Sequence, residues 1–158
     1  MTGGVHGIVA AGNATVDISN ALAFGTSDVA LDLSSASGIA TGSLSFVTIA
    51  DSGSSSTTAA GLTCSMLLSV RSTIVWTPNT TRIPIAGLCP INSTIAGPIG
   101  VAGATNVDPQ FVSAPSADYH LSPNSPARDN VDVGPAVDFE GDSRPRGVRF
   151  DIGADEAP

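Results

Sequence analysis

The sequence predicts an all-β protein: a solenoid of the parallel β-helix type, closed by a C-terminal capping segment. Aliphatic segments recur with a slow period, since four residues that end similar segments are spaced by 25, 25 and 21 residues: Phe24, Ile49, Ile74 and Ile95. A repeat of this length with several short strands in each unit is typical of solenoids. Hydrophobic residues make up 42% of the chain but aromatic residues only 4%, so thin aliphatic side chains must fill the interior.

Apolar and polar residues alternate along several short segments of residues 1–105. Val16 and Ile18 alternate with Asp17 and Ser19, and residues 29–33 and 42–49 extend in a similar way. Alternation of this kind indicates half-buried strands, and no segment shows a helical period with caps. We expect about four to five rungs whose strands stack at a spacing of about 4.8 Å. The four repeat residues would then form one internal column.

Charge divides the chain into two parts. Residues 1–105 contain four of the 14 acidic residues, and residues 106–158 contain the other ten. There is no lysine, and the formal net charge is −8, which argues against nucleic acid or an anionic membrane as a partner. No run of 18 apolar residues is present, so no membrane span is predicted. A length of 158 residues suits one domain.

The acidic part contains an ordered set of motifs. Residues 106–129 read NVDPQFVSAPSADYHLSPNSPARD, residues 138–145 read DFEGDSRP, and residues 151–156 read DIGADE. This order resembles the C-terminal closing module of bacterial right-handed parallel β-helix proteins, which include pectin-lyase-like surface proteins of the choice-of-anchor type. The resemblance implies a right-handed helix in residues 1–105, a cap in residues 106–158, and a secreted or cell-surface location. Phe111 and Tyr119 would form a lid on the last open rung.

Two cysteines lie 25 residues apart, which is one period of the repeat. Cys64 and Cys89 follow similar Gly-Leu contexts, so equivalent positions on adjacent rungs would bring their α-carbons within disulfide distance. The sequence therefore predicts a disulfide, the alternative being two buried thiols. A metal site would need further soft ligands, and only His6 and His120 are available.

Three carboxylates follow one another at every second position. Asp138, Glu140 and Asp142 would share one face of an extended segment and could supply oxygen ligands to Ca²⁺. The alternative is a solvated turn whose carboxylates pair with Arg144 or Arg146. Apart from this calcium hypothesis, the sequence predicts no cofactor.

One histidine suggests a catalytic role. His120 and Asp118 flank Tyr119, so in an extended segment they would share a face, with Asp118 orienting His120 as a general base. The alternative is a histidine that only satisfies backbone groups. No nucleophile elbow and no phosphate-binding glycine loop are present.

These observations favour a non-catalytic function: a structural or carbohydrate-contacting module of a secreted or cell-surface bacterial protein. The alternative is a polysaccharide lyase or glycoside hydrolase, or a truncated remnant of one, acting on acidic polysaccharide. Paired carboxylates, which glycoside hydrolysis requires, are not visible in the repeats. The N-terminal end shows no amphipathic helix and no acidic or basic residue other than His6 before Asp17. Since an uncapped rung exposes apolar interior and strand edges, we expect a homo-oligomer formed through this end.

Overall fold

The computed structural model describes residues 2–10, 12–34, 40–55, 59–65, 67–77 and 81–158. This part of the chain forms three sheets and contains no α-helix. The seven-stranded parallel sheet comprises β1 (Thr2–Gly4), β3 (Thr15–Thr26), β5 (Thr41–Ala50), β7 (Leu68–Arg71), β8 (Ile74–Trp76), β10 (Ile91–Asn92) and β11 (Ile95–Gly97). The four-stranded parallel sheet comprises β2 (Ile8–Val9), β4 (Leu31–Leu33), β6 (Ala59–Cys64) and β9 (Ile83–Gly87). The antiparallel pair of β12 (Phe111–Ser113) and β13 (Asp118–Leu121) is joined by a short 3-10 turn, Ala114–Ser116.

The seven-stranded sheet curls at a row of residues with left-handed backbone conformation. Their φ angles lie between 45° and 52°, and the strand register places them at matching positions: Asn20, Phe46, Ser72 and Ser93. None is glycine, so each carries the steric cost of this conformation. Strands β3 and β5 run through the bend, whereas further along the chain it separates β7 from β8 and β10 from β11. We call these four residues the bend row.

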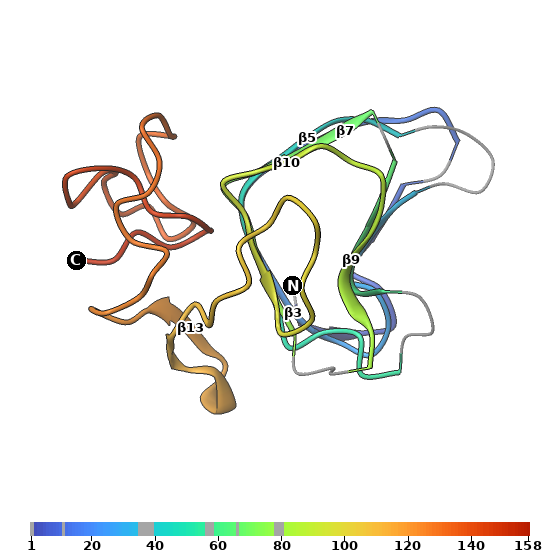
Figure 1. Ribbon diagram of the computed structural model, residues 1–158, viewed down its shortest axis with the longest axis horizontal. Helices are drawn as coiled ribbons and strands as arrows, with labels where there is room; N and C mark the ends of the chain where they lie inside the picture. Colours follow the sequence, from blue (N-terminus) through green and yellow to red (C-terminus); the bar gives the residue numbers. More distant parts are fainter. Residues whose placement is uncertain (1, 11, 35–39, 56–58, 66, 78–80) are drawn as a thin grey trace.

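The predicted right-handed parallel β-helix is wrong. The parallel strands form a curled, half-barrel sheet and a four-stranded sheet that crosses it, not a regular solenoid stack (Figure 1). Parallel pairing is present, but its spacing is uneven: register partners are 31 residues apart from Leu31 to Leu62 and 21 apart from Ile74 to Ile95. Strand lengths also differ, from 12 residues in β3 to two in β10. Unequal strands joined by loops of unequal length cannot stack as identical rungs.

Aliphatic side chains fill the interior between the two parallel sheets. The largest of them are fully buried, among them Leu31, Leu33, Leu44, Ile49, Leu62 and Leu68. These residues come from both sheets, and alternation along each strand directs them inward. The low aromatic content is consistent with this interior, because no aromatic residue belongs to the cluster.

The predicted internal column is also wrong, because Ile49 is one residue out of register with Ile74 and Ile95. Ile49 pairs with Val75, whereas Ile74 pairs with Thr48 and Ile95. A slip of one residue reverses the face to which a strand side chain points. Ile49 therefore lies in the interior, while Ile74 and Ile95 belong to a second cluster on the outer face.

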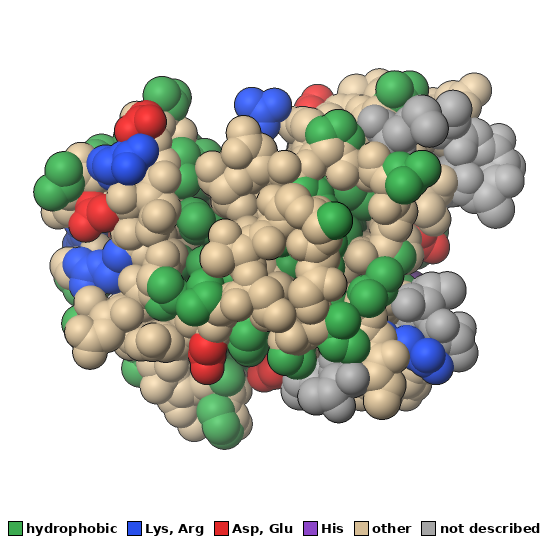
Figure 2. Space-filling model, viewed as in Figure 1, with side chains coloured by type: hydrophobic (Ala, Val, Ile, Leu, Met, Phe, Trp, Pro, Cys, Tyr) green, Lys and Arg blue, Asp and Glu red, His purple; other side chains and the backbone are tan. Residues whose placement is uncertain are grey.

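Residues 107–158, here called the C-terminal segment, lie beside the seven-stranded sheet (Figure 1). The second cluster joins the two parts through six buried residues: Ile74, Ile95, Leu121, Ala127, Ile152 and Ala157. Hydrogen bonds follow the bend row, since Asn20 Nδ2 donates to the Val137 carbonyl (2.6 Å) and the Gly153 amide donates to the Ser72 carbonyl (3.0 Å). Charged side chains are most frequent over this segment, at the left of Figure 2.

The aromatic residues expected to form a lid pack against the side of the sheet. Tyr119 contacts Phe24, with ring centroids 4.9 Å apart, and its hydroxyl donates to Asp51 Oδ2 at 2.8 Å. Phe111 packs edge-on against Tyr119. A different residue lies beside β11, the last strand of the seven-stranded sheet: Thr105 exchanges backbone hydrogen bonds with Thr94 and Ala96.

The predicted disulfide between Cys64 and Cys89 is confirmed, with their α-carbons 5.7 Å apart. The β6–β9 register pairs Cys64 with Gly87, so Cys64 is bonded to a cysteine two positions after its strand partner. A disulfide is consistent with an oxidising, extracytoplasmic location. Within the described ranges, no helix is long and apolar enough to cross a membrane.

Candidate binding site

A pocket of about 360 Å³ opens on the C-terminal segment around His120. It joins two groups of residues that the sequence suggested separately, since Asp118 and His120 line it together with Glu140 and Asp142. Asp155 and Glu156 complete its acidic lining, and Arg128 and Arg146 add positive charge. Asp138, the remaining predicted residue, does not line the pocket.

Strand β13 positions the first two of these side chains. Burial alternates along the strand, with Tyr119 and Leu121 buried and Asp118 and His120 partly exposed. Tyr119 anchors the inner face against Phe24 and Phe111. Asp118 and His120 therefore share the outer face, as alternation in an extended strand requires.

His120 is held between two carboxylates. Its Nδ1 lies 2.6 Å from Asp118 Oδ1, and its Nε2 lies 2.8 Å from Glu140 Oε2. The hydrogen bond to Glu140, followed by that to Asp118, raises the pKa of His120 to about 9. The hydrogen bond from His120 lowers the pKa of Asp118. At neutral pH the ring is thus an imidazolium that donates from both nitrogens, and it has no lone pair with which to act as a general base.

The three carboxylates considered for calcium point to different partners. Asp138 is buried, and its Oδ1 accepts the backbone N–H groups of Glu140 and Asp142, both at 2.9 Å. Glu140 binds His120, and Asp142 forms an ion pair with Arg146 (3.2 Å). No group of three or more His, Cys, Asp or Glu side chains suited to a metal ion occurs in the described part of the chain. In this turn one carboxylate, that of Asp142, is paired with Arg146, and the calcium hypothesis stays a prediction.

The end of the chain adds two acids that the sequence reasoning did not single out. Asp155 accepts the Leu121 N–H at 2.7 Å, and burial raises the pKa of its carboxyl group. Glu156 is fully buried and lies 3.5 Å from the Nε of Arg144. The available signal was the placement of both acids in a segment otherwise made of small and apolar residues, where a carboxylate must find an internal partner.

Apolar side chains accompany these charges. Leu121, Pro123, Val112 and Pro158 also line the pocket. A few polar groups beside an apolar surface are typical of small-molecule sites, in which the polar groups fix the orientation of the ligand. This pocket can therefore exchange hydrogen bonds in both directions with a ligand that also has an apolar face.

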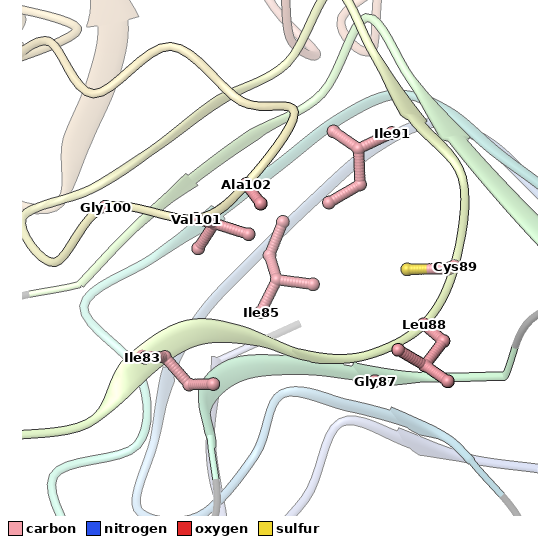
Figure 3. Close-up of a pocket in the computed structure, with 9 residues that line it drawn as sticks. All are labelled: Ile83, Ile85, Gly87, Leu88, Cys89, Ile91, Gly100, Val101 and Ala102. Atoms are coloured by element: carbon pink, nitrogen blue, oxygen red, sulfur yellow. The ribbon is translucent and has the colours of Figure 1, made fainter.

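A second pocket, of about 410 Å³, lies near the open edge of β9 and has a different character. The side chains of Ile83, Ile85, Ile91 and Val101 surround it, and Cys89 lies at its side (Figure 3). Its lining contains no titratable side chain, because Cys89 is held in the disulfide. The side chains that line this second pocket therefore offer no acid, base or nucleophile.

No known family model, curated protein or solved structure matches the chain. Function must therefore be inferred from the pocket itself.

Proposed function

We propose that the protein is a non-catalytic module of a secreted or cell-surface bacterial protein, and that it contacts carbohydrate through the pocket around His120. One observation carries this proposal: the imidazolium of His120 lies between the carboxylates of Asp118 and Glu140. This arrangement keeps the histidine protonated, so that it stabilises the pocket and cannot act as a general base. The resemblance of residues 106–156 to β-helix surface proteins supports the secreted or cell-surface location. It does not extend to the β-helix fold, which the structure contradicts.

The remaining lining suits a polyhydroxylated ligand. Sugar hydroxyls both donate and accept hydrogen bonds, and the exposed carboxylates of Glu140 and Asp142 accept while Arg128 and Arg146 donate. The pyrrolidine ring of Pro123 offers an apolar surface to the less polar face of a sugar ring. The disulfide adds support, since extracellular glycans are met in an oxidising environment.

A glycan array followed by titration calorimetry tests the proposal. We expect one class of glycan to bind the wild type and to bind Glu140→Gln at least about fivefold more weakly, since this change removes a charged acceptor. The matched control is Asp17→Asn, which neutralises an exposed carboxylate on β3 outside the pocket. Equal affinities of the two variants, or no binding to any glycan, would contradict the proposal.

A second candidate function is glycoside hydrolysis, because the pocket contains acids with opposite pKa shifts. The pKa of Asp155 is raised and that of Asp118 is lowered, as required of a general acid and an ionised partner. Release of reducing ends from uronic-acid polymers and neutral polysaccharides tests this function. Turnover that Asp118→Asn abolishes, with unchanged circular dichroism, would favour the hydrolase over the binding module.

A further inference from the structure

A third pocket, here called the arginine cleft, lies between the bend row and the C-terminal segment. Its volume is about 340 Å³, and its polar lining includes Arg71, Asn92, Ser93, Asn130, Asp132 and Arg149. We propose that the arginine cleft binds the anionic group, a carboxylate or a sulfate, of an acidic saccharide. This inference goes beyond the proposed function, because it concerns another site and requires an anionic group on the saccharide.

Charge is the first argument for this assignment. The chain carries a formal charge of −8 and only six arginines with no lysine, yet two of these arginines meet in the cleft with a single carboxylate, that of Asp132. The cleft is thus positive on a negative protein. A local field of this sign favours an anion over the surrounding surface.

Arg71 is the residue whose charge is not neutralised. It is exposed, and its Nη2 donates to Ser69 Oγ at 3.3 Å. Among the residues that the structure describes, no carboxylate forms an ion pair with it. Its guanidinium can therefore offer two parallel N–H groups to a carboxylate or sulfate, the geometry in which arginine binds these groups most strongly.

The neighbouring strand places hydrogen-bonding groups beside this guanidinium. Asn92 is the register partner of Arg71 in the β10–β7 pair, and both are exposed. Ser93 follows in the bend row, and its hydroxyl donates to Asn92 Oδ1 at 3.3 Å. An amide and a hydroxyl next to an arginine suit a ligand whose acidic group is attached to a hydroxylated body.

On the opposite wall of the arginine cleft, a carboxylate of the protein itself already binds the second arginine. Arg149 binds Asp132 through Nε and Nη2, with distances of 2.7 and 2.6 Å to Oδ1. The side chain of Asp132 is 79% exposed, so it can turn away into solvent. The anionic group of a ligand can replace it on Arg149. Val133, which is 78% exposed, adds an apolar surface at the same wall.

Titration calorimetry with four probes of equal length tests the proposal: an oligouronate, a sulfated oligosaccharide, a neutral oligosaccharide and an acidic peptide. We expect one or both anionic saccharides to bind the wild type, and the neutral saccharide and the peptide to bind at least about tenfold more weakly. The comparison of uronate with sulfate identifies the anionic group. Arg71→Gln should weaken binding about tenfold, the effect of losing one charged hydrogen-bond pair.

Asp132→Asn provides the sharper variant, because it should strengthen binding of the anionic saccharide severalfold by removing the competing carboxylate. General damage to the fold cannot produce this gain. The control is Arg82→Gln, an arginine before β9 that does not line the cleft. Equal affinities in Arg71→Gln and Arg82→Gln, no gain in Asp132→Asn, or stronger binding of the peptide would overturn the proposal. The proposed function fails separately, since it depends on Glu140 and not on Arg71.

Discussion

Ile49 and Ile74 lie on adjacent strands of one sheet, yet their side chains point to opposite faces. The register pairs Ile49 with Val75 and Thr48 with Ile74, so the two isoleucines are offset by one residue. Ile49 packs in the interior between the sheets, and Ile74 packs against the C-terminal segment. Each isoleucine thus reports on a different part of the fold.

Replacing Ile74 with Ala should lower the free energy of unfolding by about 2–5 kcal/mol, because the side chain is fully buried and the change leaves a cavity. Urea denaturation measures the loss. Limited proteolysis should show faster cleavage of residues 107–158 in this variant than in Ile49→Ala. Leu88→Ala is the control, since Leu88 is 79% exposed and its loss should cost less than about 0.5 kcal/mol. A similarly small effect for Ile74→Ala would mean that the outer cluster does not form.

Arg144 and Arg146 should contribute very differently to stability, although only Pro145 separates them. Arg144 is fully buried; its Nη2 donates to the carbonyls of Gly153 and Asp155, and its guanidinium lies 4.9 Å from the Phe46 ring centroid. Arg144→Ala leaves Glu156 buried without its ion-pair partner, and we expect a loss of about 3–5 kcal/mol.

The matched change Arg146→Ala should cost about 0–1 kcal/mol, because its ion pair with Asp142 is exposed to solvent. Thermal unfolding of both variants compares them directly. Equal losses would place the C-terminal segment elsewhere than against Phe46.

The stability of the protein should fall as the pH rises from about 6.5 to about 9. The folded-state pKa of His120, about 9, exceeds its ordinary value of 6.5, so the folded protein binds more protons than the unfolded chain in this window. The contribution of His120 is complete below pH 6.5 and is lost as the pH passes 9. Melting temperatures measured from pH 6 to pH 10 test this dependence.

His120→Gln serves as the control for this pH dependence. The chain has no lysine and only one other histidine, and few groups titrate in the same window. The melting temperature of the variant should therefore change little between pH 6.5 and pH 9. An equally steep decline in the variant would exclude His120 as the cause.

Reduction of the Cys64–Cys89 bond should destabilise the fold by about 2–4 kcal/mol, the usual effect of opening such a loop. Guanidinium denaturation with and without reductant gives the value. Intact-mass measurement after alkylation gives the redox state, and we expect no alkylated thiol before reduction. Two alkylated thiols in the unreduced protein would contradict the bond.

Self-association through the N-terminal edge remains a prediction. Strand β2 forms one edge of the four-stranded sheet, with Val5 and Val9 exposed by 62% and 55%. Sedimentation over a concentration series should show an oligomer that Val9→Asp dissociates, since a charge opposes both apolar contact and strand pairing. Val148→Asp, at an exposed valine in the C-terminal segment, is the control. A monomeric wild type at all concentrations would refute the prediction.

The sequence predicted the parallel strands and the disulfide because both follow from local signals. Alternation around Val16 and Ile18 marks β3, and the separation of Cys64 and Cys89 matches one period. Register is a different matter, because a shift of one residue leaves the spacing pattern almost unchanged while it exchanges the two faces. The bend row gives no signal either. The four residues are an asparagine, a phenylalanine and two serines, and none is the glycine that usually marks a left-handed conformation.

The pocket was predictable where its residues are close in sequence. Asp118 and His120 are two positions apart on one strand, so alternation alone places them together. The sequence suggested Glu140 as a calcium ligand. It becomes a partner of His120 only because its turn packs against β13. Asp155 is placed by its bond to the Leu121 N–H, 34 positions earlier, and the arginine cleft depends on the way the C-terminal segment lies along the bend row. Contacts between residues so far apart in the chain produce no repeating pattern in the sequence.

The burial of residues 151–157 determines the order in which the sheets and the C-terminal segment can pack during synthesis. These seven residues are all buried, and Ala154 donates its N–H to Thr48 Oγ1, a partner 106 positions earlier. The parallel sheets can pair while the chain is still being translated, since their contacts lie within residues 2–105. The outer face at Ile74 and Ile95 stays incompletely covered until Leu121, Ala127 and residues 151–157 have been synthesised. During that interval a nascent chain carries an apolar surface, which is where a chaperone would bind it.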